Sequence, residues 1–218
     1  MAEKKIFMVS NLRYFEEDIV NYEYFGGFAV SQKQKCIVSL HESINQRYRN
    51  KHILEISTKS LQPLGVELSA FNLKFFHEEL GEEKCLENVF QSSKVFTGGG
   101  PYRDLLDVKP KDAKRDERLQ NSGRLIGFNL YNQMWPLNPQ TMFYDWIYIK
   151  ALMQHEELAK EILEYDVFTD IEFNHKRSLN CQARAAAIFV GLSKKGELEE
   201  KISTPEKFAT VYGNGLSY

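Results

Sequence analysis

Apolar residues recur every three or four positions along several stretches of this chain, which is the spacing of one helix face. Ile37, Leu40 and Ile44 follow this spacing. Ser31 and the glutamine three positions later form a capping box ahead of them. The pattern therefore predicts a helix over residues 32–48.

Other stretches alternate with the period of a strand. Residues 5–9 and 167–173 are expected to be strands, and residues 124–135 a hairpin that turns at 131–133. Further helices are expected over residues 82–96, 111–119, 138–165 with a break near 155, 179–192, and from 204 onward. Asn138 and Pro139 have the residue types that begin a helix. These elements predict an α+β protein in which helix predominates.

The chain has 218 residues, without internal repeats or a low-complexity linker, which favours a single compact domain. We expect residues 1–60 to be an N-terminal elaboration packed on a core of residues 61–218, the two forming one structural unit.

Composition excludes several classes of protein. The net charge of −2 argues against an extended basic surface for nucleic acid, although basic residues outnumber acidic ones between positions 33 and 59. That local excess fits either phosphate contacts or a solvated helix face. Three scattered cysteines, without metal-ligand spacing, predict no disulfide framework and no zinc. No long apolar run is present, so a soluble, cytoplasmic protein without a cofactor is expected.

The segment Glu87-Asn-Val-Phe-Gln-Ser-Ser-Lys94 carries the clearest chemical signal. In a helix, Glu87, Gln91 and Lys94 would share one face, which Phe90 and Val95 flank. A carboxylate beside an ammonium in a partly apolar wall is a plausible acid/base pair. The alternative is a surface helix with an ordinary charge pattern.

Other candidate groups have simpler explanations. Gly98–Gly100 lacks the remainder of a phosphate-binding motif, so we expect a helix C-cap and turn. Asp104 and Asp107 lie among basic residues and are expected to be solvated charges. Trp146 is expected in the core, whereas Trp135 could pack there or stack on a base.

Five segments, taken in order, resemble the NADAR (YbiA-like) superfamily, whose name refers to NAD and ADP-ribose. They are Gly65-Val-Glu-Leu-Ser-Ala-Phe71, the segment Glu87–Lys94, Trp135 with Phe143–Lys150, Asp170-Ile-Glu172, and Ser178–Arg184. The resemblance implies a single NADAR-like core with short strands.

The chain departs from the family pattern at two points. The family's Asp-x-x-Trp-Gly loop is missing between Phe173 and Ser178, so Glu172 or Asp170 would have to replace its acid. The asparagine of the family's Ser-Asn-Phe is Ala70 here.

The whole chain is most similar to NADAR antitoxins found beside DarT-type DNA ADP-ribosyltransferase toxins. This resemblance implies an ADP-ribosyl glycohydrolase that frees guanine bases of DNA from ADP-ribose, with ADP-ribosylated DNA, ADP-ribose and such a toxin as partners. Glu87 and Lys94 would be catalytic. The substrate-binding residues would be Gly65, Ser69, Phe71, Phe90, Gln91, Trp135, Glu172 and Asn180.

Three alternatives remain open at this point. The protein could bind ADP-ribose or modified nucleic acid without cleaving it, or it could neutralise a toxin by direct contact. An N-glycosidase acting on a riboflavin-pathway intermediate is a further enzymatic possibility.

Overall fold

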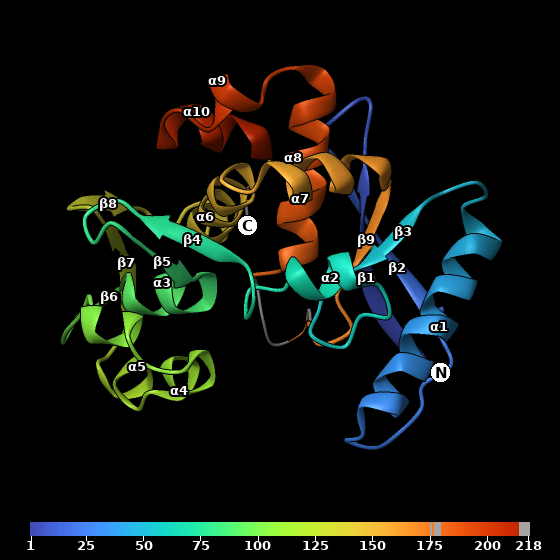
Figure 1. Cartoon of the computed structure of the whole chain (residues 1–218), viewed down its shortest axis with the longest axis horizontal. Helices are drawn as coiled ribbons and strands as arrows, with labels where there is room; N and C mark the ends of the chain where they lie inside the picture. The colour runs from blue at the N-terminus through green and yellow to red at the C-terminus, as the bar shows by residue number, and fades with distance from the viewer. Residues whose placement is uncertain (175, 177–179, 214–218) are drawn as a thin grey trace. The chain divides into compact units, whose positions relative to one another are not determined.

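The computed structural model describes residues 1–174, 176 and 180–213, which form two compact units that alternate along the chain (Figure 1). The first unit comprises Met1–Ser69 and His155–Glu199, and the second comprises Ala70–Gln154 and the residues from Glu200 onward. Residues 1–60 thus belong to the same unit as 155–199. The division into 1–60 and 61–218 stays a prediction.

The first unit is built on a four-stranded sheet in the order β2-β1-β9-β3. Its strands are β1 (Ala2–Val9), β2 (Phe15–Tyr22), β3 (Ile53–Glu55) and β9 (Val167–Thr169). β1 runs antiparallel to β2 and to β9, whereas β3 runs parallel to β9. Two segments that are more than a hundred residues apart in the sequence therefore supply the two middle strands.

Helices complete the first unit (Figure 1). They are α1 (Val30–Arg47), α2 (Pro63–Glu67), α7 (Glu156–Glu161), the 3-10 turn η2 (Ile162–Glu164) and α8 (Gln182–Lys195). The apolar stripe of α1, from Cys36 to Ile44, packs into a core with Ile6, Val20 and Val167 of the sheet. Burial of this stripe explains why the 3.6-residue period of the sequence is so regular here.

The second unit contains a hairpin, β4 (Lys74–His77) with β5 (Glu82–Cys85), and a three-stranded sheet. That sheet has the order β6 (Lys94–Phe96), β7 (Leu125–Leu130), β8 (Gln133–Trp135). Its helical elements are α3 (Leu86–Ser92), η1 (Arg103–Leu106), α4 (Pro110–Arg115), α5 (Arg118–Asn121), α6 (Met142–Met153), α10 (Pro205–Ala209) and η3 (Thr210–Tyr212). α9 (Leu198–Lys201) spans the boundary between the units. The buried α3 and α6 pack against each other within this unit.

Most predicted elements are confirmed, and so is the α+β class, although the expected predominance of helix is not established. The helix over residues 32–48 corresponds to α1, and the hairpin turns at Tyr131 and Asn132, whose φ angles are 53° and 58°. The break near residue 155 is also present, between α6 and α7.

Several predicted boundaries are wrong. Ala29, not Ser31, precedes α1, and no side chain caps it. The strand predicted over residues 167–173 ends at Thr169. α6 begins at Met142 rather than after Asn138, because the Pro139 carbonyl closes a turn by accepting the Met142 N–H at 3.0 Å.

Residues 82–96 do not form one helix. They are divided among β5, α3 and β6. The hydroxyls of Ser92 and Ser93 both donate to the carbonyl of Val89, at 3.1 and 2.7 Å, which favours an end to the helix. The Ser93 carbonyl then accepts the Asn129 N–H at 2.7 Å, and the chain continues as a strand of the sheet.

Candidate active site

Glu87 lies in the first turn of α3, in the second unit. The start of this helix is anchored by two backbone hydrogen bonds of 3.0 Å, from Leu86 to the Leu73 carbonyl and from Glu87 to the Ala70 carbonyl. Every residue of α3 is buried. A carboxylate in the first turn of a helix interacts favourably with the positive end of the helix dipole.

A second helical residue holds the Glu87 carboxylate in place. Gln91, one turn later, donates from Nε2 to Oε1 of Glu87 at 2.8 Å. Glu87 is only 4% exposed, and the Oε1 atom of Gln91 is buried without a hydrogen-bond partner among the described residues. A buried acceptor of this kind is rare and is a ready partner for a hydroxyl group. The spacing that the sequence indicated for Glu87 and Gln91 is confirmed.

Lys94 belongs to the same cluster but not to the same helix, because it is the first residue of β6. Its side chain is half-buried, and its Nζ lies 4.9 Å from the centroid of the Phe90 ring. Burial lowers the pKa of Lys94 to about 8, against a smaller upward effect of Glu87 and with a further downward effect of Lys114. An amine with such a pKa can exchange a proton near neutral pH.

Lys114 is a member of this cluster that sequence reasoning missed. Its Nζ lies 3.8 Å from Oε1 of Glu87 and 5.2 Å from the centroid of the Phe71 ring. It comes from α4, which the charge pattern indicated only as a short exposed helix. No motif in the sequence distinguishes Lys114 from its neighbours Lys109 and Lys111.

The aromatic residues of the second unit differ in their surroundings. Phe90 is buried, with its ring centroid 5.4 Å from that of Phe128 and 5.0 Å from that of Tyr144. Trp135 is 1% exposed, and its ring lies 4.6 Å from that of Trp146. The ring of Trp135 is therefore part of the core of its own unit, contrary to the alternative that it stacks on a base.

The ten predicted site residues are divided between the two units. Phe71, Glu87, Phe90, Gln91, Lys94 and Trp135 lie in the second unit, whereas Gly65, Ser69, Glu172 and Asn180 lie in the first. Within the second unit, Glu87, Gln91, Lys94 and Phe90 form one connected group, and Lys114 links Phe71 to Glu87.

The four residues of the first unit have different environments. A Cβ atom on Gly65 would lie 1.9 Å from the Glu55 carbonyl oxygen, so close packing requires glycine there. Ser69 is buried. Glu172 is exposed, 3.7 Å from the Lys33 amine. Asn180 is half-buried, and its Oδ1 has no hydrogen-bond partner among the described residues. Of the segment where the family loop is missing, positions 175, 177 and 178 lie outside the described residues.

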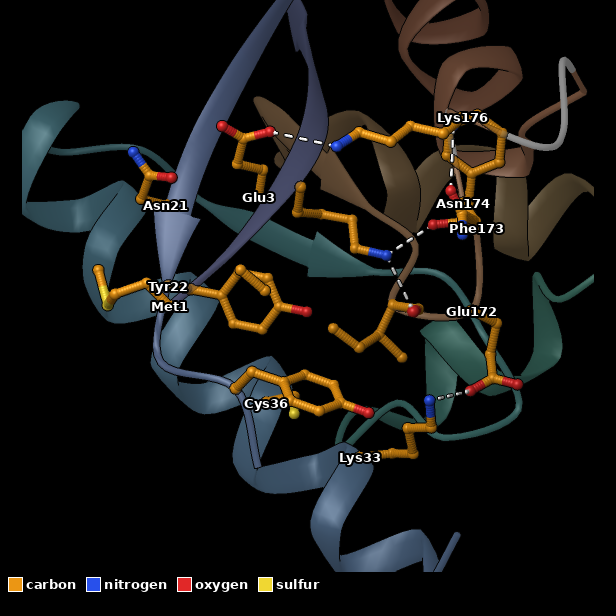
Figure 2. Close-up of a pocket in the computed structure, with 14 residues that line it drawn as sticks. Met1, Glu3, Asn21, Tyr22, Lys33, Cys36, Glu172, Phe173, Asn174 and Lys176 are labelled. Carbon is orange, nitrogen blue, oxygen red and sulfur yellow. Dashed lines mark hydrogen bonds and ion pairs between the residues drawn. The ribbon is translucent and has the colours of Figure 1, made fainter. Parts of the chain in front are cut away.

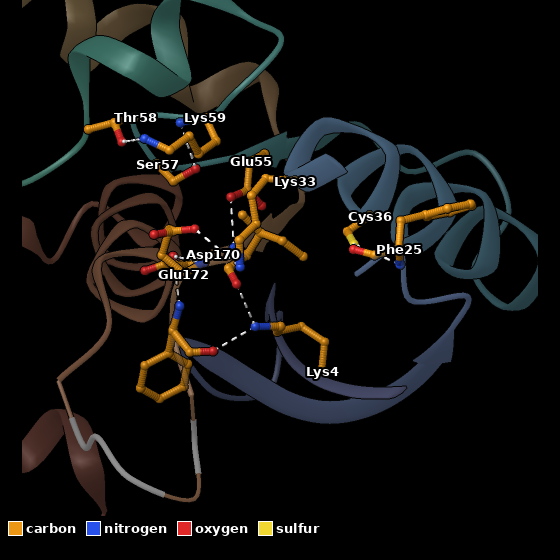
Figure 3. A network of polar contacts seen from close by, with 12 residues as sticks. Lys4, Phe25, Lys33, Cys36, Glu55, Ser57, Thr58, Lys59, Asp170 and Glu172 are labelled. Atoms are coloured by element: carbon orange, nitrogen blue, oxygen red, sulfur yellow. Dashed lines mark hydrogen bonds and ion pairs between the residues drawn. The ribbon is translucent and has the colours of Figure 1, made fainter. Parts of the chain in front are cut away.

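A buried carboxylate in the first unit was also missed from the sequence (Figure 3). Glu55, at the end of β3, accepts the Ile171 N–H at 2.7 Å and the Thr169 hydroxyl at 2.5 Å. Nε2 of His41 lies 3.0 Å from the same Thr169 oxygen. An acid within the apolar run Ile53-Leu-Glu-Ile56 is the sequence signal that could have identified it.

Asp170 is the second buried acid of this network. Burial raises the pKa of Asp170 to about 7, and the nearby Glu55 adds to this effect while Lys4 opposes it. Its Oδ1 accepts the N–H groups of Glu172 and Phe173, at 3.0 and 3.1 Å. These contacts fix the backbone that follows β9.

Two further predictions concern Asp104 with Asp107 and the glycines at 98–100. Asp104 and Asp107 form ion pairs with Arg118 at 2.6 Å and Lys84 at 2.5 Å, as solvated charges do. Gly98–Gly100 forms a turn after β6, not a helix C-cap. Among residues 1–174, 176 and 180–213, no cluster of potential ligands is arranged to hold a metal ion, and no helix has the length and apolar character to cross a membrane.

Comparison with known proteins gives one clear result. The family model described as DarT1-associated NADAR antitoxin matches residues 2–216, nearly the whole chain. No curated protein matches the chain.

Proposed function

The chain belongs to the DarT1-associated NADAR antitoxins, and we propose that it is an ADP-ribosyl glycohydrolase that removes ADP-ribose from guanine bases of DNA modified by a DarT-type toxin. The observation that carries the proposal is the buried Glu87 carboxylate, which Gln91 holds beside a lysine of lowered pKa. Perturbed groups of this kind concentrate at functional sites.

The reaction would break the N-glycosidic bond between the anomeric carbon of ADP-ribose and a guanine nitrogen. Breaking this bond develops positive charge on the ribose ring, as in glycoside hydrolysis generally. A carboxylate on that face stabilises the charge or activates the attacking water. Glu87 is the residue we assign to this role, because its carboxylate is oriented by Gln91 and lies close to two amines.

The departing guanine needs a proton, and Lys94 is suited to supply it. With a pKa of about 8, its amine is largely protonated at neutral pH, yet it gives up the proton more readily than an ordinary lysine. The same charge would also attract the Glu87 carboxylate or contact a phosphate group. Lys114, 3.8 Å from Glu87, supplies a second positive charge for the pyrophosphate or the carboxylate.

The remaining contacts would serve binding. The unpartnered Oε1 of Gln91 suits a ribose hydroxyl, and Phe71 and Phe90 would provide apolar walls. Gly65, Ser69, Glu172 and Asn180 stay proposed contacts to ADP-ribose. We no longer assign base stacking to Trp135, because its ring is enclosed by the core.

Two other functions differ from this proposal in what they require of Glu87. A reader of ADP-ribosylated DNA would bind the modified strand without turnover, and an antitoxin acting by contact would need the toxin but not the carboxylate. The N-glycosidase acting on a riboflavin-pathway intermediate is a further alternative, which would leave modified DNA unchanged.

The test uses single-stranded DNA that carries ADP-ribosylated guanine and has been freed of toxin. A catalytic amount of the wild-type protein should release many equivalents of ADP-ribose, and Glu87→Gln should reduce the rate by at least about a hundredfold while keeping the fold. Glu83→Gln, an exposed acid in β5, is the matched control and should retain the wild-type rate. Full activity of Glu87→Gln would refute the assignment, and binding without release would make the protein a reader.

A further inference from the structure

A cavity in the first unit shares no lining residue with the cluster around Glu87, which belongs to the second unit. We propose that this cavity holds an unmodified nucleotide of the single-stranded DNA substrate and so anchors the strand. The inference rests on the proposed function, to which it adds a binding site for the strand itself.

The cavity has a volume of about 780 Å³ and is lined by residues of β1, β2, α1, the loop that follows β2 and the segment that follows β9 (Figure 2). Ligand sites commonly have volumes of roughly 300–1,000 Å³, so the cavity has room for a nucleotide. Its walls combine aromatic rings with amino groups, which are the two kinds of group that single-stranded nucleic acid requires.

Aromatic side chains occupy three parts of the lining. Tyr22 and Phe173 are buried and form fixed walls, whereas Tyr24 is 52% exposed at the cavity. Burial raises the pKa of Tyr22 to about 12, so its hydroxyl stays protonated and uncharged. Any nucleobase, whatever its identity, can stack on an exposed ring such as that of Tyr24.

Two lysines supply positive charge to the cavity. Nζ of Lys33 lies 3.7 Å from Glu172, and Nζ of Lys176 lies 3.8 Å from Glu3 (Figure 2). Both separations exceed ordinary hydrogen-bond lengths, so the carboxylates balance the charges without hydrogen-bonding to either ammonium group. A phosphate oxygen that approached either amine would gain a charge-assisted hydrogen bond.

The wall after β9 is held in place before any ligand arrives. The buried amine of Lys4 donates to the carbonyl oxygens of Ile171 and Phe173, at 3.0 and 2.6 Å. Asp170 accepts the two N–H groups described above, one of them from Phe173. Carbonyl and N–H groups of this backbone segment are therefore held by hydrogen bonds. Preorganised contacts of this kind lower the entropic cost of binding.

Features beside the cavity favour a strand over a free nucleotide. Phe28, which follows Tyr24 in the same loop between β2 and α1, is fully exposed. The loop that contributes Tyr24 to the cavity therefore carries a second exposed ring. A polymer can use these groups together, whereas a single nucleotide fills only the cavity.

The test measures the anisotropy of a fluorescein-labelled, unmodified single-stranded oligonucleotide titrated with the full chain. Tyr24→Leu should weaken binding about fivefold or more, and Tyr24→Phe, which keeps the ring, should restore it. Lys33→Gln should reduce the slope of log K against log salt by about 0.7, the value for one phosphate contact on a single strand. Lys51→Gln makes the same charge change in an exposed lysine of this unit that does not line the cavity, and should have little effect.

Other results would overturn the inference. Absence of binding by the wild type, or equal losses in the cavity variants and in Lys51→Gln, would show that no strand is held here. A free deoxynucleoside monophosphate that bound as tightly as the oligonucleotide would make the cavity a nucleotide site instead. Unchanged DNA binding combined with weaker capture of the DarT-type toxin would reassign this surface to a protein partner.

The outcome can be separated from that of the proposed function. The anisotropy titration needs neither modification nor turnover, so it stands even if the protein cleaves nothing. If cleavage occurs, Tyr24→Leu should raise KM for a modified oligonucleotide and leave cleavage of ADP-ribosylated deoxyguanosine, which has no strand, unchanged.

Discussion

Glu87 and Lys94 show how burial changes the environment of individual side chains. The carboxylate sits at a helix start and accepts a hydrogen bond of 2.8 Å from Gln91, so its orientation is set. The amine is half-buried over the Phe90 ring and has a lowered pKa. The Glu87 carboxylate is thus held in one orientation, and the Lys94 amine releases its proton more readily than an ordinary lysine. An acid/base pair would need both properties.

The lowered pKa of Lys94 predicts a particular pH profile. If protonated Lys94 donates the proton to the leaving guanine, kcat/KM should fall as the pH rises through about 8, by tenfold for each further unit. Measurement of kcat/KM from pH 6 to 10 checks this decrease. Lys94→Arg, which stays charged throughout, should lose most of the activity.

Two results would contradict the role of proton donor. A rate that rises through pH 8 would identify the neutral amine as the active form. If Lys94→Arg were fully active and its kcat/KM did not fall above pH 8, Lys94 would serve only as a positive charge that interacts with Glu87 or phosphate.

At the residue scale, spacing in the sequence predicted the Glu87 and Gln91 pair, because a four-residue separation fixes neighbours on a helix. It could not predict Lys114, which reaches Glu87 through tertiary packing of α4. It also could not decide whether Trp135 lies in the core, since a ring before a proline suits either role until its neighbours are known.

At the scale of elements, short segments proved harder to assign than long ones. α1 carries an apolar stripe over 18 residues, and its prediction is confirmed. Residues 82–96 contain two strands and a seven-residue helix. Each of these elements is too short to show a clear periodicity of apolar residues. The hairpin at Tyr131 and Asn132 was predictable because strand alternation stops at residues that favour a turn.

The contact between α2 and β3 gives a prediction at this scale. Gly65→Ala should lower the free energy of unfolding by at least about 2 kcal/mol, because the added Cβ would meet the Glu55 carbonyl at 1.9 Å. Urea denaturation measures the change. Gly26→Ala is the matched control, since a Cβ there meets only Tyr24 at 3.9 Å, and it should change stability by less than about 1 kcal/mol.

The same two variants also distinguish a packing role of Gly65 from a role in substrate binding. A stable Gly65→Ala protein with an increased KM would show that the glycine serves substrate binding, contrary to the packing explanation.

At the scale of the molecule, the chain passes between the two units three times, after Ser69, Gln154 and Glu199, which no local pattern in the sequence reveals. β9 pairs with β1 on one side and with β3 on the other, and both of these partners lie within residues 1–60. The order of the five family segments predicted the family, but not this division, because the segments fall in both units.

Removal of residues 1–60 therefore tests the organisation of the whole chain. Without β1 and β3, β9 loses both neighbours, so the truncated protein should lack the cooperative thermal transition of the full chain, as followed by circular dichroism. A truncated protein that unfolds at the full-length Tm and retains cleavage would establish residues 1–60 as an elaboration of an independent core.

Under the proposed function, this protein restores guanine in DNA by cleaving the bond between the base and ADP-ribose. The most direct measurement is the mass of an ADP-ribosylated single-stranded oligonucleotide before and after incubation with the protein, together with the small product released. The oligonucleotide should return to the mass of its unmodified form, and intact ADP-ribose should be released. An unchanged mass, or an oligonucleotide that has lost its guanine, would contradict the proposed function.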